Sequence, residues 1–350
     1  MWKLVLQTLS IVYVVVFLTV SFMVMLPFFL VVRIVGGASA ARRYVAFPAG
    51  GWVVYPMLTT LAEAWGHSKT HLHVEGREGL VAGESALVLA NHVCAFDWFS
   101  VMRLGVRTQS AGWLVILAKE SIRYIPVVGW AVAMAGVMLR RSWDLDSTRL
   151  YRAFRSAGSA QQPVWLMIHP EGTRMCPEKL EASQAWLAEK GKAQMEHVLA
   201  PRVKAVVAAL SALHDRFAAV YDVTLAYPDG FPTLFNIAGR DAPPAHIHVD
   251  RIPIQDVLGF VADQIGADVD DVPALFTATA DGDADAAARV LPALKAWLYG
   301  RWELKEQRLL DFYRRGGGFG DEGRVEDGVW DHPGMGEHLA YVGRGFFPDH

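Results

Sequence analysis

The sequence predicts an α/β fold: a central, mostly parallel sheet flanked by helices, with an N-terminal membrane-embedded helical segment. Two apolar β-like runs, residues 86–90 and 164–168, are each followed at once by polar side chains. Buried parallel strands end in this way at the ligand-binding edge of an open α/β sheet. Residues 201–221 place apolar side chains at helical spacing and lead into another β-like run, residues 221–227. An uncharged apolar run, residues 4–32, opens the chain.

Residues 4–32 are long enough to cross a membrane as a helix. At about 1.5 Å per residue, a helix of this length exceeds the roughly 30 Å hydrocarbon core. It can span the bilayer with tilt, or bend near Pro27 into a helical pair within one leaflet. A cleaved signal peptide is the rival interpretation, because Ala38-Ser39-Ala40 resembles a cleavage site. The apolar run, however, is longer than the about 7–15 residues of a typical signal peptide core.

A second, mostly apolar stretch covers residues 45–65 and contains two prolines and two glycines. It is expected to be an interfacial or re-entrant element rather than a clean span, and residues 1–66 are together assigned to a membrane anchor. Three arginines follow the first run and only Lys3 precedes it, which favours a cytosolic side for the rest of the chain. The membrane would be a bacterial inner membrane or the endoplasmic reticulum.

The remaining chain divides into three expected parts. Residues 67–262 form the catalytic domain, residues 263–315 an acidic linker and a C-terminal helix that packs on the core, and residues 316–350 a Gly-rich tail. The C-terminal helix is expected over residues 286–313, where Lys and Arg alternate with Leu and Trp.

Composition narrows the class of function. The chain is 53% hydrophobic with a mean hydropathy of +0.22, more apolar than a typical soluble enzyme. Its two cysteines argue against a disulfide framework, and no basic, aromatic-interleaved patch suggests a nucleic-acid partner. His246 and His248 share one face of an alternating run, but no Cys or Glu cluster completes a metal site. They are expected to be exposed strand residues, and no metal is assigned.

Two polar motifs carry the candidate chemistry, Asn91-His92-x-x-x-x-Asp97 and His169-Pro-Glu-Gly-Thr-Arg174. Moving an acyl group from a thioester to an alcohol requires a base for the hydroxyl proton, and a neutral imidazole such as that of His92 is the usual acceptor. Asp97 can return around a tight turn or helix start to the other ring nitrogen and fix its tautomer. About one H-x-x-x-x-D match is expected by chance in a chain of this length, so the second motif strengthens the interpretation.

These motifs resemble those of the 1-acylglycerol-3-phosphate O-acyltransferase (lysophosphatidic acid acyltransferase) family of glycerolipid acyltransferases, over roughly residues 53–312. The Asp-Trp, Gly-Trp and Arg-x-Trp-x-x-Asp details are most similar to the branch of plant-type, lysocardiolipin and lysophosphatidylinositol enzymes. The matching segments are Asn91 to Trp98, Lys119, Pro126 to Trp130, Gly136 to Asp146, Pro170 to Arg174, Pro201-Arg202 and Val220 to Pro228.

The resemblance implies a role for each candidate residue. By this resemblance His92 is the base and Asp97 is its partner. The acceptor phosphate is bound by Arg141 and Arg174, and Lys119 contacts the head group. The acceptor site is shaped by Glu171, Gly172 and Thr173. A guanidinium pairs with phosphate bidentately, which agrees with the arginine assignments. Simpler alternatives are a solvated Arg141, a Lys119 that is only surface charge, and a Glu171 that merely pairs with Arg174.

Three positions depart from the family pattern. Cys94 stands where Ser is common, His169 where Phe is common, and Met138-Leu139 where a Phe-Ile or Phe-Leu pair is common. Cys94 raises the alternative of an acyl-thioester intermediate activated by His92. Residues two apart in an extended segment lie roughly 6–7 Å apart, however, which places their side chains poorly for a hydrogen bond. His169 is expected to pack or to form a hydrogen bond rather than to act as a second base.

The expected function is therefore transfer of an acyl group from acyl-CoA, a substrate rather than a bound cofactor, to a lysophospholipid at the bilayer. Lysophosphatidic acid, which would give phosphatidic acid, is the first expected acceptor. Remodelling of lysocardiolipin or lysophosphatidylinositol is the second expectation. A lipid hydrolase and a non-catalytic lipid-binding protein are the alternatives of other classes.

Overall fold

The computed structural model describes residues 2–41, 70–75, 79–125, 129–130, 132, 137–139, 147–158, 163–239, 241–319 and 324–326. The strands are β1 (Thr70–Glu75), β2 (Ala86–Ala90), β3 (Leu114–Lys119), β4 (Val137–Leu139), β5 (Trp165–Ile168), β6 (Ala219–Ala226), β7 (Ala245–Pro253) and β8 (Arg324–Glu326). The α-helices are α1 (Trp2–Ala41), α3 (Asp97–Arg107), α5 (Ser147–Gly158), α6 (Pro177–Glu189), α7 (Val203–Leu213), α8 (Leu234–Ala238), α9 (Ile254–Ile265), α10 (Val272–Asp281) and α11 (Ala284–Arg314), with 3-10 helices η4 (Ala111–Trp113), η5 (Glu120–Tyr124) and η7 (Val269–Asp271).

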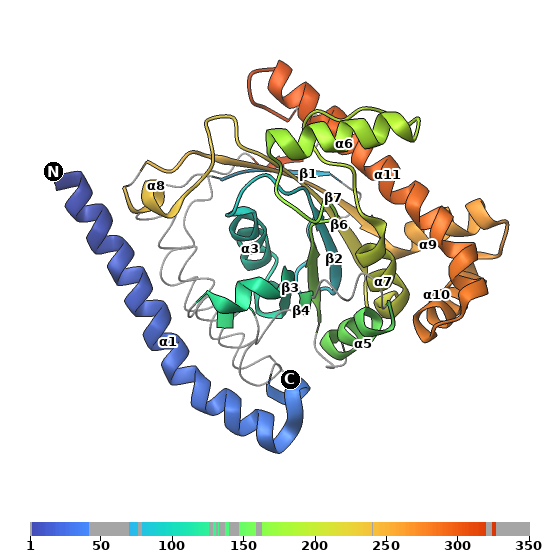
Figure 1. The fold of residues 1–350 in the computed structure, drawn as a ribbon, viewed down its shortest axis with the longest axis horizontal. Helices are drawn as coiled ribbons and strands as arrows, with labels where there is room; N and C mark the ends of the chain where they lie inside the picture. The colour runs from blue at the N-terminus through green and yellow to red at the C-terminus, as the bar shows by residue number, and fades with distance from the viewer. Residues whose placement is uncertain are drawn as a thin grey trace.

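The strands form one eight-stranded sheet in the order β4-β3-β5-β2-β6-β7-β1-β8. Neighbours pair in parallel from β4 through to β6, and again between β7 and β1. The β6–β7 and β1–β8 pairs are antiparallel. This topology confirms the predicted α/β class with a mostly parallel sheet (Figure 1).

The sheet is covered on both faces because its central strands are apolar on both sides. Leu87 and Leu89 of β2 pack into a core built with α5, α7 and α9 to α11, whereas Val88 and Ala90 pack into a second core built with α3. Figure 1 shows α3 on one side of the sheet and α5, α7 and α11 on the other. The central strands β2 and β5 are fully buried, as their uninterrupted apolar sequences predict.

Parallel pairing brings the two polar motifs together. Leu89 of β2 lies in register with Ile168 of β5, so both strands end at the same edge of the sheet. His92 and His169 therefore leave neighbouring strands side by side.

Two helical predictions are corrected in extent. Helix α7 ends at Leu213, earlier than the apolar periodicity to residue 221 predicts, because a turn at residues 214–216 leads directly into β6. The stretch expected to be an acidic linker instead contains α10, whose Phe276 is fully buried against the core. The expected C-terminal helix is present as α11.

The N-terminal apolar run forms a single helix, α1, which continues through Pro27 and departs from helical geometry at Gly37. Its segment Gln7–Gly37 is, within the described residues, the one helix long and apolar enough to cross a membrane. Among the described residues, α1 contacts the rest of the protein through Gln7 and Phe22. Gln7 Nε2 donates to the Phe235 carbonyl oxygen at 3.2 Å, and the rings of Phe22 and Trp130 lie 5.5 Å apart. The second apolar stretch, residues 45–65, lies outside the described residues.

Candidate active site

The loop that follows β2 is fixed to the neighbouring strand by its first side chain. Asn91 Nδ2 donates to the Leu225 carbonyl oxygen at 3.0 Å, and the Leu225 backbone N–H donates to Asn91 Oδ1 at 2.8 Å. A buried amide that is satisfied in both directions holds the backbone of the next residue, His92, in one place.

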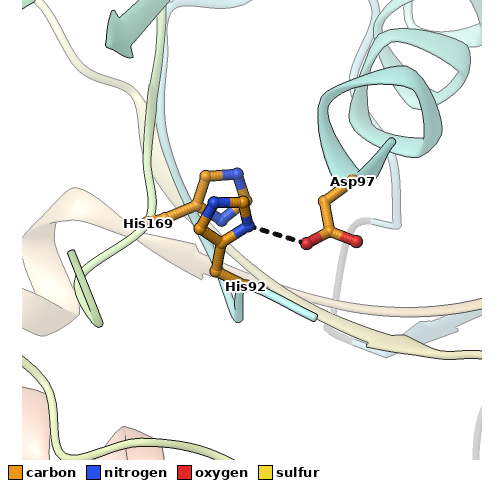
Figure 2. A group of neighbouring side chains, drawn as sticks. All are labelled: His92, Asp97 and His169. Atoms are coloured by element: carbon orange, nitrogen blue, oxygen red, sulfur yellow. Dashed lines mark hydrogen bonds and ion pairs between the residues drawn. The ribbon is translucent and has the colours of Figure 1, made fainter. Parts of the chain in front are cut away.

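The imidazole of His92 pairs with the carboxylate of Asp97, the first residue of α3 (Figure 2). His92 Nδ1 lies 2.9 Å from Asp97 Oδ2, and 25% of the His92 side chain is exposed while that of Asp97 is fully buried. The same carboxylate oxygen accepts the backbone N–H groups of Val93 at 2.6 Å and Cys94 at 2.9 Å. Its other oxygen accepts the Tyr227 hydroxyl at 3.0 Å. These donors fix the position of the carboxylate beside the imidazole.

A carboxylate acceptor assigns the proton of His92 to Nδ1. The lone pair of the neutral ring is then on Nε2, the nitrogen directed away from Asp97. The partly exposed ring can therefore take a proton from a bound hydroxyl, while the buried Asp97 stabilises the imidazolium that results.

Cys94 is held as a thiol beside this pair. Its Sγ donates to Asp97 Oδ1 at 3.2 Å. Burial, followed by the nearby Asp97 charge, raises the pKa of the Cys94 thiol to about 12. A neutral thiol is a poor nucleophile, so the geometry does not favour the acyl-thioester alternative.

His169 stacks on His92. The rings of His92 and His169 lie 4.2 Å apart and 15° from parallel (Figure 2). His169 Nδ1 lies 3.0 Å from the carbonyl oxygens of both Ala90 and Asn91, which assigns its proton to that nitrogen. Burial, together with the neighbouring His92, lowers the pKa of His169 to about 4. The ring therefore stays neutral at pH 7 and does not oppose the charge that forms on His92.

Glu171 accepts a hydrogen bond from the backbone of His92 rather than forming an ion pair with Arg174. Its Oε1 accepts the His92 backbone N–H at 3.3 Å. Glu171 is buried, and burial raises its pKa to about 8. Arg174 is exposed, and no ion pair joins the two side chains in the described part of the chain. Glu171 therefore shapes the loop that carries His92.

Gly172 has a φ of 68°, a backbone conformation that suits glycine. A Cβ at this position would lie 3.1 Å from Arg202 Cδ. The loop after β5 is thereby turned back on itself, with Thr173 half-buried next to it.

The structure describes two of the three expected phosphate ligands, Lys119 and Arg174. Lys119 ends β3 and Arg174 follows β5, so both exposed cations lie at the same edge of the sheet as His92. Arg141 lies outside the described residues.

Three possible metal ligands converge, since donor atoms of His92, Asp97 and His169 lie within 4.8 Å of one another. Hydrogen bonds already engage the Asp97 oxygens and the Nδ1 atom of each ring. The arrangement is that of a proton-transfer pair with a neutral neighbour.

His246 and His248 were expected to be exposed strand residues. They are instead half-buried, and the rings of His246 and His71 stack with their centroids 4.4 Å apart.

Sequence reasoning missed the buried charges that hold α11 on the sheet. Lys305 Nζ contacts Asp222 Oδ1 and donates to the Val223 carbonyl oxygen, both at 2.6 Å. Although burial raises it, the charges of Lys305 and Arg301 lower the pKa of Asp222 to about 2. This network positions β6, which ends just before Tyr227 and its hydrogen bond to Asp97. A charge at helical spacing gives no local signal that it will be buried.

A cavity of about 150 Å³ adjoins the loop that follows β2. Its lining combines residues from that loop, from the loop after β5, from the segment between α6 and α7, and from β6 and α11: Val93, Met175, His197, Leu225, Leu309 and Tyr313. His197 is itself fixed by Glu306 of α11, with Nδ1 3.1 Å from Oε1. The C-terminal helix thus contributes one wall beside the site.

Comparisons with known proteins find similar sequences over much of the chain. The Acyltransferase family matches residues 71–226, which contain both polar motifs. The probable 1-acyl-sn-glycerol-3-phosphate acyltransferase 5 of Arabidopsis thaliana is 28% identical over 79% of this chain and 65% of its own length. Lysocardiolipin acyltransferase 1 of Gallus gallus is 26% identical over 71% of this chain and 59% of its own length. The chain thus spans about three-fifths of the length of these relatives.

Among solved structures, the 1-acyl-sn-glycerophosphate (LPA) acyltransferase PlsC of Thermotoga maritima is 18% identical, with a TM-score of 0.43, over 72% of this chain and 86% of that one. The family match contains His92, Asp97 and Glu171. Over the segment that carries both polar motifs the chain is therefore similar to proteins of the Acyltransferase family, and the two relatives described above are named as a probable 1-acyl-sn-glycerol-3-phosphate acyltransferase and a lysocardiolipin acyltransferase.

Proposed function

We propose that this protein transfers an acyl group from acyl-CoA to the free hydroxyl of 1-acyl-sn-glycerol-3-phosphate, giving phosphatidic acid and free coenzyme A. The observation that carries the proposal is the 2.9 Å pair of a partly exposed imidazole and a fully buried carboxylate at the carboxyl edge of the sheet. The name of the Arabidopsis thaliana relative supports this acceptor.

The chemistry requires one base and no covalent enzyme intermediate. Nε2 of His92 removes the hydroxyl proton as the oxygen attacks the thioester carbonyl. The tetrahedral intermediate then collapses and expels the coenzyme A thiolate, which takes the proton from the His92 imidazolium. Asp97 stabilises the imidazolium throughout, and the neutral His169 ring adds no opposing charge.

The acceptor phosphate is proposed to bind the cations at the same sheet edge. Arg174 is exposed in the loop that also carries Glu171, and Lys119 ends β3 nearby in the sheet order. A guanidinium that grips the phosphate would hold the hydroxyl against His92 and turn a bimolecular step into a positioned one. Arg141 is the second proposed ligand, on the strength of the sequence resemblance.

Remodelling of lysocardiolipin is the second candidate, supported by the name of the Gallus gallus relative. The test is purified protein supplied with labelled acyl-CoA and a panel of lysophospholipids. Esterification fastest on lysophosphatidic acid supports the proposal, and a preference for lysocardiolipin or lysophosphatidylinositol selects the alternative. Labelled fatty acid formed from water alone would indicate a hydrolase.

The membrane is the proposed place of action. Apolar side chains such as Phe28 and Val31 project from α1 without cover, and hydrocarbon is the environment that suits them. The arginines that follow the helix favour a catalytic domain on the cytosolic side. The expected result is that the full chain sediments with membranes and resists extraction by alkaline carbonate. Release by carbonate would contradict the anchor.

A further inference from the structure

Large apolar side chains are exposed on two segments of the catalytic domain that contact α1. One segment leads from the end of β6 into α8, and the other leads from β3 through η5 to Trp130. We call these residues the aromatic rim: Tyr124, Ile125, Trp130, Phe231 and Phe235. Tyr124 is 78% exposed and Phe235 is 68% exposed. Exposed aromatic side chains gathered at one side of a protein mark an interaction surface.

The rim is continuous with the apolar surface of α1. Gln7 contacts the backbone of Phe235, and Phe22 contacts the ring of Trp130. Figure 1 shows α1 along one flank of the domain with α8 near its N-terminal end, while α10 and α11 lie on the opposite flank. Since the uncovered faces of α1 are apolar, a bilayer is the partner whose chemistry fits both surfaces.

Charged side chains near the aromatic rim limit how deeply it can insert into a bilayer. Lys119 and Arg123 adjoin Tyr124, and Asp229 and Asp241 flank the Phe231–Phe235 loop, all of them accessible to solvent. Such groups are tolerated among lipid head groups but are costly at the bilayer centre. The rim therefore belongs at the interface, the level that aromatic side chains prefer.

The same limit applies to the orientation of α1. Gln7 and Phe22 are separated by about 22 Å along the helix axis, at 1.5 Å per residue. A perpendicular span would carry Trp130, and Arg123 near it, far into the hydrocarbon. An α1 that lies shallow in one leaflet keeps both contacts at the interface.

The rim also borders the active site. The ring of Phe231 packs edge-on against Tyr227, with centroids 5.9 Å apart, and the Tyr227 hydroxyl donates to Asp97. We propose that the aromatic rim inserts into the interface of the leaflet that holds α1, and that its Phe231–Phe235 loop is the entrance through which the lysophospholipid leaves that leaflet for His92. The entrance rests on the proposed function, whereas the insertion does not.

Insertion is tested on the full chain in nanodiscs of phosphatidylcholine and phosphatidylglycerol. A Cys176→Ser background leaves the buried Cys94 thiol, and a fluorophore is attached at Phe235→Cys or, as a matched control, at the exposed Leu291→Cys of α11. Quenching by lipids labelled near the head group at residue 235, but by aqueous iodide at residue 291, is expected. Equal iodide quenching at both sites would overturn the insertion.

The entrance is tested by kinetics of Phe231→Ser/Phe235→Ser against the control pair Val269→Ser/Leu291→Ser. The first pair should raise the KM for a long-chain lysophospholipid in vesicles by about 10-fold or more, because it removes apolar contact with the leaflet. The kcat for a short-chain, monomeric acceptor should stay near the wild-type value. Equal effects of the two pairs, or an equal loss on both acceptors, would overturn the entrance. If the wild type transfers no acyl group, the proposed function fails, and the quenching still decides the insertion.

Discussion

The Asp97→Asn substitution removes the charge beside His92, the proposed base, while keeping the size of the side chain. In the wild type, Asp97 Oδ2 binds His92 Nδ1 at 2.9 Å and accepts two backbone N–H groups. An asparagine oxygen can keep the backbone bonds, but the imidazolium formed during proton transfer then faces a neutral amide. We expect turnover to fall and the fold to survive.

The size of the effect follows from the burial of the pair. A hydrogen bond to a charged group contributes about 1.5–3 kcal/mol, and two charges about 4 Å apart attract by roughly 4 kcal/mol at an effective dielectric constant of 20. At 1.36 kcal/mol per tenfold change in rate, kcat should fall between about 10-fold and 1,000-fold. The KM for either substrate should change little, since the carboxylate is fully buried and contacts neither.

The assay is release of free coenzyme A from acyl-CoA in the presence of lysophosphatidic acid, with thermal melting as the check on folding. Tyr227→Phe is the matched control, because it removes a donor to the same carboxylate at 3.0 Å and leaves the His92–Asp97 bond in place. It should lose about 10-fold or less. An Asp97→Asn protein that melts normally and keeps its full kcat would refute the role of the buried charge.

Three further substitutions test the surrounding site. Glu171→Gln mimics the protonated acid. Because the pKa of Glu171 is raised to about 8 in the folded protein, the stability of the wild type falls as the pH rises toward 8, and the free energy of unfolding of the variant should gain about 2 kcal/mol over that of the wild type between pH 6.5 and 8, at 1.36 kcal/mol per pH unit. Parallel curves of unfolding free energy against pH would contradict this. Cys94→Ser should stay active, whereas a trapped acyl adduct on Cys94 would support the covalent route. Arg174→Ala should raise the KM for the lysophospholipid far more than that for acyl-CoA, and lysine should rescue only in part; a defect confined to acyl-CoA would assign this arginine to the coenzyme A phosphates.

Local pattern predicted the elements whose residues are uniformly apolar or regularly spaced. The central strands β2 and β5 have uninterrupted apolar sequences, and α11 repeats its Leu and Trp residues over many turns. Because both strands are buried and parallel, their polar continuations had to meet at one edge. Predicting that His92 and Asp97 would lie close together needed only a short turn between them.

The features that could not be predicted from the sequence depend on packing between segments that are far apart in the chain. Nothing near Lys305 indicates that its ammonium group will be buried against Asp222, more than eighty residues earlier in the chain. The burial of Glu171 and the stacking of His169 on His92 likewise depend on neighbouring loops. The helix α10 was obscured by acidic residues on its flanks, since Phe276 is buried only through contact with the core. Tyr227 reaches Asp97 because β6 lies beside β2.

The central claim is that His92 is the base that activates the acceptor hydroxyl. Its most direct test is the rate at which folded His92→Ala protein esterifies lysophosphatidic acid with labelled acyl-CoA, compared with the wild type under the same conditions. Loss of a general base predicts a fall in turnover of about two to four powers of ten with an unchanged melting temperature. Near-normal formation of phosphatidic acid by this variant would contradict the mechanism.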